Sequence, residues 1–322
     1  MSQIAIVMAS DEGYAMAACV AMYSILNSKN PSTSYKFYLL VQEKFNETIL
    51  SKFDELFSSY PESCLELIKM GTWFNDAPTH FHITKESYYR LSIPDILPNV
   101  GKCIWLDVDI IVRDDLTDLW NFNLGDNYIA AVSDVLGQHR CKELGISCKE
   151  QYINAGVLLI NVNAMRKDNI VDLLLSHVDK GYIFADQDIL NKVCLGRISL
   201  LPLKYNILIP YALDLALLAD TFTSTEVDEA LNNPVVIHYN ASTKPWNSHS
   251  IHARLYHLWY CAAADSPFNF DVKEDLFNKK NKLPLKPDFF ESRYDALYNS
   301  ITFRIGRLFM FLPRILKRVL KL

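Results

Sequence analysis

Two carboxylates, Asp107 and Asp109, lie within the otherwise apolar run 104–112 and are the first candidates for chemistry. An unpaired charge is expensive in such surroundings. Alternate residues of a regular strand share a face, so both carboxylates at a strand end can bind one hard cation and leave its other positions to phosphate oxygens and water. The same spacing also arises in turns and helix caps, and the triplet by itself leaves that interpretation open.

A second candidate is His238, within the strand-like run 235–239 that precedes Lys244. A lone histidine is commonly a hydrogen-bonded core or surface residue. Added to two carboxylates, however, an imidazole completes an O,O,N donor set that suits Mn²⁺ or Mg²⁺ rather than a thiolate-binding metal. Lys244 supplies a point charge for phosphate. Together the two clusters predict a metal–diphosphate site.

Further polar residues adjoin predicted strands and helices. The Asn-Ala-Gly segment 154–156 precedes the apolar run 157–162, and Arg90 falls on a predicted helix. A cation on a helix is commonly just a solvated side chain.

Asp186, Gln187 and Asp188 open another predicted helix. Asp186 suits the N-cap and Asp188 the positive end of the helix dipole, which would be structural roles. A site role for these three residues remains the alternative.

Apolar runs alternate with helical stretches along the chain. Strands are predicted at 3–9, 35–41, 64–69, 102–107, 128–132 and 157–162. Helices are predicted near 14–28, 46–59, 84–97, 138–144 and 163–180. This alternation predicts an α/β fold with a mostly parallel sheet and helices on both faces. No Gly-x-Gly occurs, so the dinucleotide fingerprint is missing, and so is the Gly-Lys-Ser/Thr phosphate loop.

Composition places the 322 residues among folded globular chains, with 50% hydrophobic residues and a net charge of −5. The seven cysteines include no Cys-x-x-Cys pair, which argues against a zinc ribbon or a disulfide framework. We expect neither a signal peptide nor a membrane-spanning helix. A shift to proline and polar residues predicts a main domain at 1–264, a connecting segment at 265–300 and an appendage at 301–322.

The appendage 301–322 carries six basic residues, whereas all 37 Asp and Glu lie before it. On a helical wheel its apolar residues fall opposite its basic ones, the pattern of a helix at a membrane surface, with Pro313 kinking or dividing it. A helix docked on the protein's own body is the alternative. The acidic remainder argues against nucleic acid as a partner.

Taken together, these motifs resemble the family 8 glycosyltransferases over roughly residues 3–260. These are retaining nucleotide-sugar transferases that include lipooligosaccharide galactosyltransferases, lipopolysaccharide glucosyltransferases and glycogenin. The resemblance implies a GT-A-like fold with a mixed, mostly parallel central sheet flanked by helices. Donor-binding roles then fall on Ala9, Asp11, Tyr14, Arg90, Asp107, Asn154, Ala155, Gly156, Asp186 and Lys244. Metal-binding roles fall on Asp107, Asp109 and His238, and catalytic roles at the sugar on Gln187 and Asp188.

The implied activity is metal-dependent transfer of galactose or glucose from a UDP-hexose to a saccharide, in lipooligosaccharide, lipopolysaccharide or another cell-surface glycan. Mn²⁺ is the expected metal, with Mg²⁺ as an alternative. Double displacement through Gln187 or Asp188 and attack on the face of the leaving group both remain open. The implied location is the cytoplasmic face of the inner membrane, reached through residues 301–322.

Two positions depart from the family pattern. Ala241 stands three residues after His238 where glycine is usual, and Gly13 stands where asparagine is common. Alanine still offers its N–H to a diphosphate, so the change affects the fit rather than the activity, provided that φ stays negative.

Two rival functions remain at this stage. A haloacid-dehalogenase-like phosphohydrolase also carries Asp-x-Asp after an apolar strand, but normally after the first strand rather than beyond residue 100. A non-catalytic saccharide-binding relative would be favoured by the loss of a metal ligand, and Asp107, Asp109 and His238 are all present.

Overall fold

The computed structural model describes residues 3–43, 45–79, 84–147, 152–209, 215–240, 244–246 and 255–271. Most of the predicted connecting segment, the predicted membrane helix 301–322 and Ala241 lie outside these ranges. Within them, no helix is long and apolar enough to cross a membrane.

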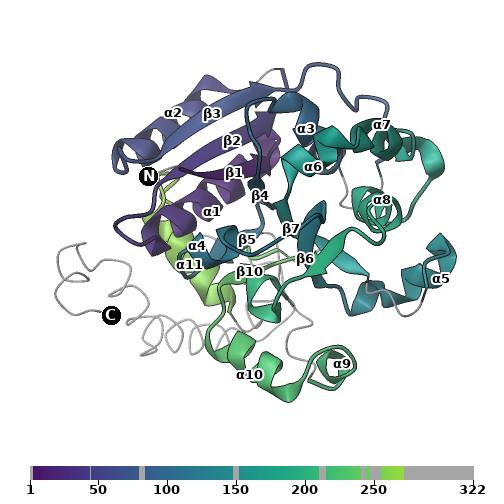
Figure 1. Cartoon of the computed structure of the whole chain (residues 1–322). Helices are drawn as coiled ribbons and strands as arrows, with labels where there is room; N and C mark the ends of the chain where they lie inside the picture. Colours follow the sequence, from purple (N-terminus) through teal and green to yellow (C-terminus); the bar gives the residue numbers. More distant parts are fainter. Residues whose placement is uncertain are drawn as a thin grey trace, which may run out of the picture.

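A seven-stranded sheet forms the centre of the molecule, with strand order β3-β2-β1-β4-β7-β6-β8 (Figure 1). Its strands are β1 (Ile4–Ala9), β2 (Tyr35–Val41), β3 (Cys64–Lys69), β4 (Cys103–Leu106), β6 (Ile129–Ser133), β7 (Ile153–Ile160) and β8 (Ile198–Leu200). Only β7 runs antiparallel, against both β4 and β6. The predicted mixed, mostly parallel sheet is confirmed.

A small second sheet has the order β5-β10-β9, formed by β5 (Ile110–Val112), β9 (Ile207–Leu208) and β10 (Val236–His238). β5 follows β4 after a short link and pairs antiparallel with β10, with His238 opposite Ile110. This pairing brings a residue from late in the chain beside the end of β4.

Helices cover both faces of the large sheet, which explains the uninterrupted apolar runs of its strands. In β1, Ile4, Ile6 and Met8 pack in one core, whereas Ala5 and Val7 pack in the other. The first face is covered by α1 (Ala15–Ser28), α2 (Glu47–Ser58) and α11 (Tyr256–Asp265). The second is covered by α3 (Ile93–Ile96), α6 (Val162–Lys167), α7 (Ile170–Leu175) and α8 (Ala185–Val193). The remaining helices are α4 (Thr117–Trp120), α5 (Arg140–Leu144), α9 (Leu215–Ala219) and α10 (Ser224–Asn232).

Three of the predicted elements differ in detail. The helix expected at 84–97 is mostly a 3-10 helix, η2 (Lys85–Ser92), continued by α3. The helix expected at 163–180 is divided into α6, α7 and a short 3-10 turn, with Asn169 left-handed between α6 and α7. The strand expected at 157–162 is β7, which begins earlier, so Asn154, Ala155 and Gly156 lie within the strand rather than ahead of it.

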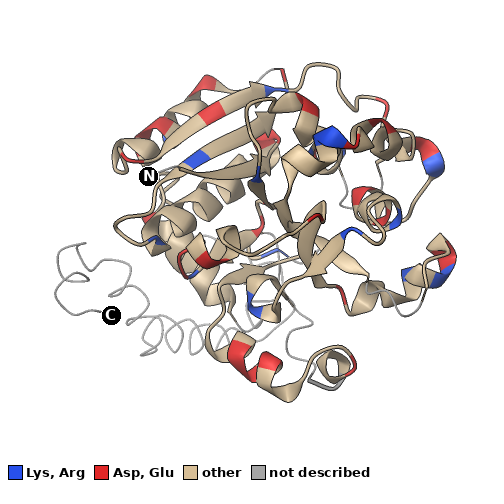
Figure 2. Ribbon diagram, in the orientation of Figure 1, with Lys and Arg blue, Asp and Glu red and all other residues tan. Residues whose placement is uncertain are grey.

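The order of the strands fixes where a site can form. From β1 the chain moves outward through β2 to β3 and then returns to β4 on the other side of β1. Such a reversal leaves a crevice at the carboxyl ends of the two central strands. Acidic residues also occur along α2 and α10 (Figure 2).

Candidate active site

A pocket of about 350 Å³ lies at the carboxyl ends of β1 and β4, at the predicted crevice. Thirteen of the fourteen predicted site residues line it: Ala9, Asp11, Tyr14, Arg90, Asp107, Asp109, Asn154, Ala155, Gly156, Asp186, Gln187, His238 and Lys244. Asp188 does not line it.

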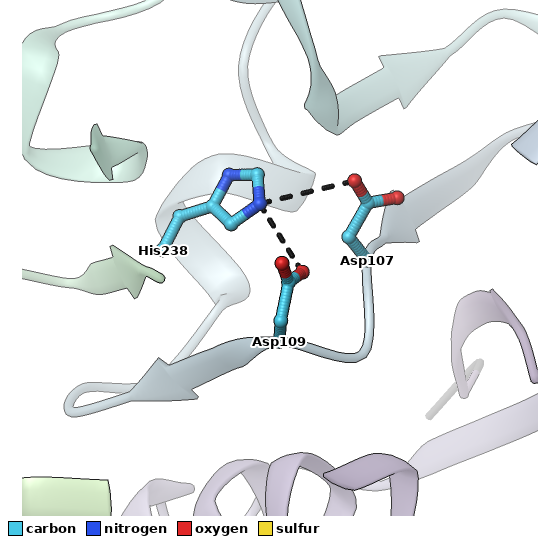
Figure 3. Close-up of side chains that lie close together, drawn as sticks. All are labelled: Asp107, Asp109 and His238. Atoms are coloured by element: carbon cyan, nitrogen blue, oxygen red, sulfur yellow. Dashed lines mark ion pairs between the residues drawn. The ribbon is translucent and has the colours of Figure 1, made fainter. Parts of the chain in front are cut away.

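The metal-ligand candidates are three residues of the pocket lining that converge on one point: Asp107, Asp109 and His238 (Figure 3). β4 ends at Leu106, and both aspartates lie in the link to β5. The expectation that they share one face of a regular strand was therefore wrong. Instead, the Asp107 N–H donates to the Gly156 carbonyl at 2.8 Å and the Tyr239 N–H to the Asp109 carbonyl at 2.8 Å. These bonds fix the link between the two sheets.

One candidate ligand atom from each of the three side chains lies within 4.8 Å of the others. His238 Nε2 is 3.2 Å from Asp109 Oδ1 and 3.9 Å from Asp107 Oδ2. Two carboxylate oxygens and an imidazole nitrogen around one point fit Mn²⁺ or Mg²⁺. The donor set is therefore chemically suited to the metal that the sequence predicts.

Lys244 lies against this cluster and forms an ion pair with Asp109. Burial by itself raises the pKa of Asp109, but the Lys244 ammonium and the His238 imidazole outweigh it and hold that pKa well below its ordinary value. Asp109 is thus charged at neutral pH, as a metal ligand must be.

Arg90 is buried, and the interpretation as a solvated cation was wrong. Its guanidinium contacts Asp107 Oδ1 at 2.8 Å and Asp186 Oδ2 at 3.0 Å, and it also donates to the Ala155 carbonyl. It lies over the Trp105 ring, whose Nε1–H donates to Asp107 Oδ1 at 2.9 Å. Arg90 therefore joins the metal-ligand candidates to the start of α8.

The start of α8 differs from the prediction in one respect. The helix begins at Ala185 with Phe184 at the N-cap, so Asp186 is not the cap but a first-turn residue paired with Arg90. The pKa of Asp186 is raised to about 7, chiefly because the side chain is buried; Arg90 opposes this rise, and the charges of Asp107 and Asp188 add to it.

Gln187 and Asp188 point in different directions. Gln187 lines the pocket and accepts the Ala155 N–H at 3.0 Å. Asp188 is fully buried and pairs with Arg140 at 2.7 Å and with the Tyr152 hydroxyl at 2.6 Å. It also accepts the Phe184 N–H at 3.0 Å, which agrees with the predicted role at the helix start.

Gly156 allows the His238 ring to pack directly against the backbone of β7. A Cβ at this position would lie 2.2 Å from His238 Cε1 and 3.0 Å from Asn154 Oδ1. The absence of a side chain is therefore required for His238 to lie where it does.

Another part of the pocket wall is formed by Ala9, Asp11 and Tyr14, at and just after the end of β1. Asp11 Oδ1 accepts the Tyr14 N–H at 2.8 Å, and the Tyr14 ring meets Trp246 edge-on at 5.8 Å. Burial raises the pKa of both Asp11 and Tyr14 above their usual values. This wall offers an aromatic ring and a carboxylate, groups suited to a nucleoside.

Three buried residues of the site escaped the sequence analysis: Asp134, Arg140 and Asn206. Asp134 lines the pocket and accepts from Gln187 Nε2 at 3.0 Å. It follows the strand predicted at 128–132, and a polar residue at the carboxyl end of a strand is a usable signal. Arg140 and Asn206 are single polar residues outside any motif, and nothing in the sequence marks them.

A GT-A-like glycosyltransferase is the class that this fold and site define: a mixed, mostly parallel sheet with helices on both faces and an Asp-x-Asp crevice at the end of β4. The chain belongs to glycosyl transferase family 8, whose family model matches residues 5–250. This membership replaces the phosphohydrolase alternative.

Relatives and solved structures agree with the family. The chain is 28% identical to the general stress protein A of Bacillus subtilis (strain 168), over 77% of this chain and 88% of that protein. It is 24% identical to the lipopolysaccharide 1,2-glucosyltransferase of Escherichia coli, over 92% and 88%. The crystal structure of the galactosyltransferase LgtC with donor and acceptor sugar analogues superposes with a TM-score of 0.70 at 26% identity, covering 86% of this chain and all of LgtC.

Proposed function

We propose that the protein is a retaining hexosyltransferase that moves galactose or glucose from a UDP-hexose to a saccharide acceptor in lipooligosaccharide, lipopolysaccharide or another cell-surface glycan. The observation that carries the proposal is the convergence of Asp107, Asp109 and His238 beside Lys244 in the pocket of a family 8 chain. The names of the glucosyltransferase and galactosyltransferase relatives support the choice of hexose and glycan.

In this proposal two groups of pocket residues contact different parts of the donor. Asp11 and Tyr14 contact the uridine beside Ala9, and Asp107, Asp109 and His238 hold Mn²⁺ or, alternatively, Mg²⁺. When bound, the metal acts as a Lewis acid that offsets the charge of the leaving diphosphate. Lys244 stabilises the same charge, and Arg90 holds Asp107 in place while contributing positive potential.

The hydrogen bonds around Gln187 bear on how retention is achieved. Gln187 Oε1 accepts from Ala155 N at 3.0 Å and from Asn154 Nδ2 at 3.1 Å, which occupies both lone pairs of that oxygen. Asp188 is fully buried and already paired. Neither residue has a free oxygen for a covalent intermediate, and this favours attack on the face that the diphosphate leaves, with Gln187 as a fixed dipole beside the sugar.

The decisive experiment is UDP-sugar consumption over a panel of donors, with Mn²⁺, with Mg²⁺ and with chelator, followed by analysis of the anomeric product. We expect one UDP-hexose to be consumed only with metal, and the α-configuration of the donor to be kept. Consumption of no UDP-sugar would favour the non-catalytic saccharide-binding alternative, and an inverted product would reject retention.

We further propose that residues 301–322 attach the protein to the cytoplasmic face of the inner membrane. The support is the sequence: six basic residues opposite an apolar helical face. At about 1 kcal/mol per basic residue near an anionic surface, attachment reaches at most roughly 6 kcal/mol, so it is reversible and sensitive to salt.

Sedimentation with anionic liposomes tests the attachment. The full chain is expected to pellet and to be partly released by high salt, whereas a chain ending at Ser300 stays in solution and still consumes the donor. Equal pelleting of the two proteins would mean that 301–322 docks on the protein's own body.

A further inference from the structure

Three amide side chains, two of them buried, connect the start of α8 to His238. Gln187 Oε1 accepts from Asn154 Nδ2 at 3.1 Å, and Asn154 Oδ1 accepts from Asn206 Nδ2 at 2.8 Å. Asn206 Oδ1 lies 3.0 Å from His238 Nδ1. Asn206 has no exposed surface, and Asn154 and His238 are almost as deeply buried. We call Gln187, Asn154 and Asn206 the amide chain.

Backbone N–H groups fix the orientation of the first two amides. The Ala155 N–H points at one terminal atom of Gln187 at 3.0 Å, and the Gly156 N–H points at one terminal atom of Asn154 at 2.9 Å. A backbone N–H can only donate, so each of these atoms is the amide oxygen. The remaining Asn154 nitrogen then donates to Gln187 Oε1 and to Asp134 Oδ2, the latter at 3.3 Å.

The orientation of Asn206 follows from that of Asn154. The atom of Asn206 that faces Asn154 Oδ1 must be its nitrogen, because two amide oxygens at 2.8 Å would repel one another. Its oxygen therefore faces His238. An amide oxygen only accepts, so His238 Nδ1 must carry the hydrogen.

This proton position decides which ring nitrogen is available to a cation. With the hydrogen on Nδ1 held by Asn206, Nε2 is the ring nitrogen left to bind a cation, and Nε2 is the atom that lies 3.2 Å from Asp109 and 3.9 Å from Asp107. The ring cannot shift easily, because it packs against Gly156 where even a Cβ would not fit. A second hydrogen-bonding partner of a ligating histidine typically sets its tautomer and orientation.

We propose that Asn206 is a positioning residue: through the amide chain it holds the hydrogen of His238 on Nδ1 and so turns the Nε2 lone pair toward the cation between Asp107 and Asp109. The proposal deepens the proposed metal site and rests on it for the identity of the cation. The proton position itself is a property of the protein with or without metal.

The first test is direct. The imidazole nitrogens of the ¹⁵N-histidine-labelled protein are observed by long-range ¹H–¹⁵N NMR, metal-free and with UDP and the diamagnetic ion Mg²⁺. The His238 signals are those that disappear in His238→Ala. We expect Nδ1 to bear a hydrogen in both states, and an unprotonated Nδ1 in either state would overturn the proposal.

The second test removes the acceptor. Asn206→Leu keeps the approximate size but leaves Nδ1 without a partner, and we expect Mn²⁺ binding in the presence of UDP, followed by electron paramagnetic resonance, to weaken ~10- to 100-fold. Asn206→Asp keeps an oxygen facing Nδ1, although its second oxygen then faces Asn154 Oδ1 without a hydrogen to donate, so it should retain the Nδ1 hydrogen and bind Mn²⁺ more tightly than Asn206→Leu. Equal loss in both variants, or wild-type affinity in Asn206→Leu, would contradict the positioning role.

Asn191→Leu is the matched control, because Asn191 is another buried amide whose partners are backbone atoms of Ile153 and Gln187 rather than His238. It should lower the melting temperature without moving the His238 signals. Asp107→Asn distinguishes a failure of the proposed metal site from a failure of the role proposed for Asn206. If it binds Mn²⁺ as the wild type does, the proposed metal site fails, whereas loss in Asp107→Asn with none in Asn206→Leu rejects only the role of Asn206.

Discussion

Two segments of this chain carry the same pattern, aspartate-x-aspartate, and the fold uses them differently. Asp107 and Asp109 lie in the extended link between β4 and β5, and both reach the metal-ligand cluster. Asp186 and Asp188 lie in the first turn of α8, where residues two apart point about 200° away from each other. Asp186 therefore faces the pocket and Asp188 the interior.

The difference shows that the spacing of two aspartates in the sequence indicates whether they face one site only when the backbone conformation is known. In the link, Arg90 compensates the charge of Asp107 and Lys244 compensates that of Asp109. In the proposed function, a metal bound by both aspartates compensates the two charges further. In α8, each aspartate pairs with a different guanidinium: Asp186 with Arg90, which also contacts Asp107, and Asp188 with Arg140. In the proposed function the aspartates of the link bind a ligand, whereas Asp188 of α8 stabilises the fold.

The largest expected effect comes from a substitution in the link between β4 and β5. Asp109→Asn removes the charge of a proposed metal ligand, and we expect turnover of the proposed UDP-hexose donor to fall by about 1000-fold, comparable to the loss of a major electrostatic stabiliser. Circular dichroism should show an unchanged fold. Asp126→Asn removes an exposed charge outside the pocket and serves as the control for net charge. Wild-type turnover in Asp109→Asn would remove the link from the mechanism.

The second effect comes from a substitution of Asp188, the buried aspartate of α8. Asp188→Ala leaves Arg140 buried without its main partner, and we expect the free energy of unfolding to fall by about 3–5 kcal/mol. Arg140→Met combined with Asp188→Leu should recover much of this loss, because an apolar pair no longer needs charge compensation. Denaturant unfolding measures both. An Asp188→Ala protein of wild-type stability with abolished transfer would instead assign Asp188 to the chemistry.

The third effect is the contribution of Asp186 to the pH dependence of the free energy of unfolding. Because the pKa of Asp186 is raised to about 7, the fold favours its protonated form, whose stabilisation is present at low pH and is lost as pH rises toward 7. Relative to Asp186→Asn, the wild type should lose at most about 4 kcal/mol of unfolding free energy between about pH 4 and pH 7. A parallel pH dependence in the two proteins would show that Asp186 is ionised throughout.

The smallest effect concerns Glu143, the second carboxylate on Arg140. Its side chain is 54% exposed, so solvent screens the pair. We expect Glu143→Ala to change the free energy of unfolding by no more than about 1 kcal/mol. A loss as large as that of Asp188→Ala would mean that Arg140 depends on both partners equally.

Much of the fold was predictable because apolar runs covered on both faces leave a direct trace in the sequence. The strands predicted at 35–41 and 64–69 have those same bounds in the structure, and the other four predicted strands agree to within a few residues. The divided helix 163–180 was not predictable, because its boundaries depend on a left-handed Asn169 and on packing against η2.

The sequence by itself determined the class of site: two carboxylates, a histidine and a lysine whose chemistry suits a metal and a diphosphate. Only the tertiary structure decided which of these side chains meet and which do not. The pairing of β10 with β5 brings His238 to Asp109. The helical turn directs Asp188 away from Asp186, and the orientation of the Asn206 amide sets the hydrogen on His238. The physical reason is that direction and burial belong to the folded backbone, and a lone polar residue such as Asn206 carries no periodicity that would reveal its partner.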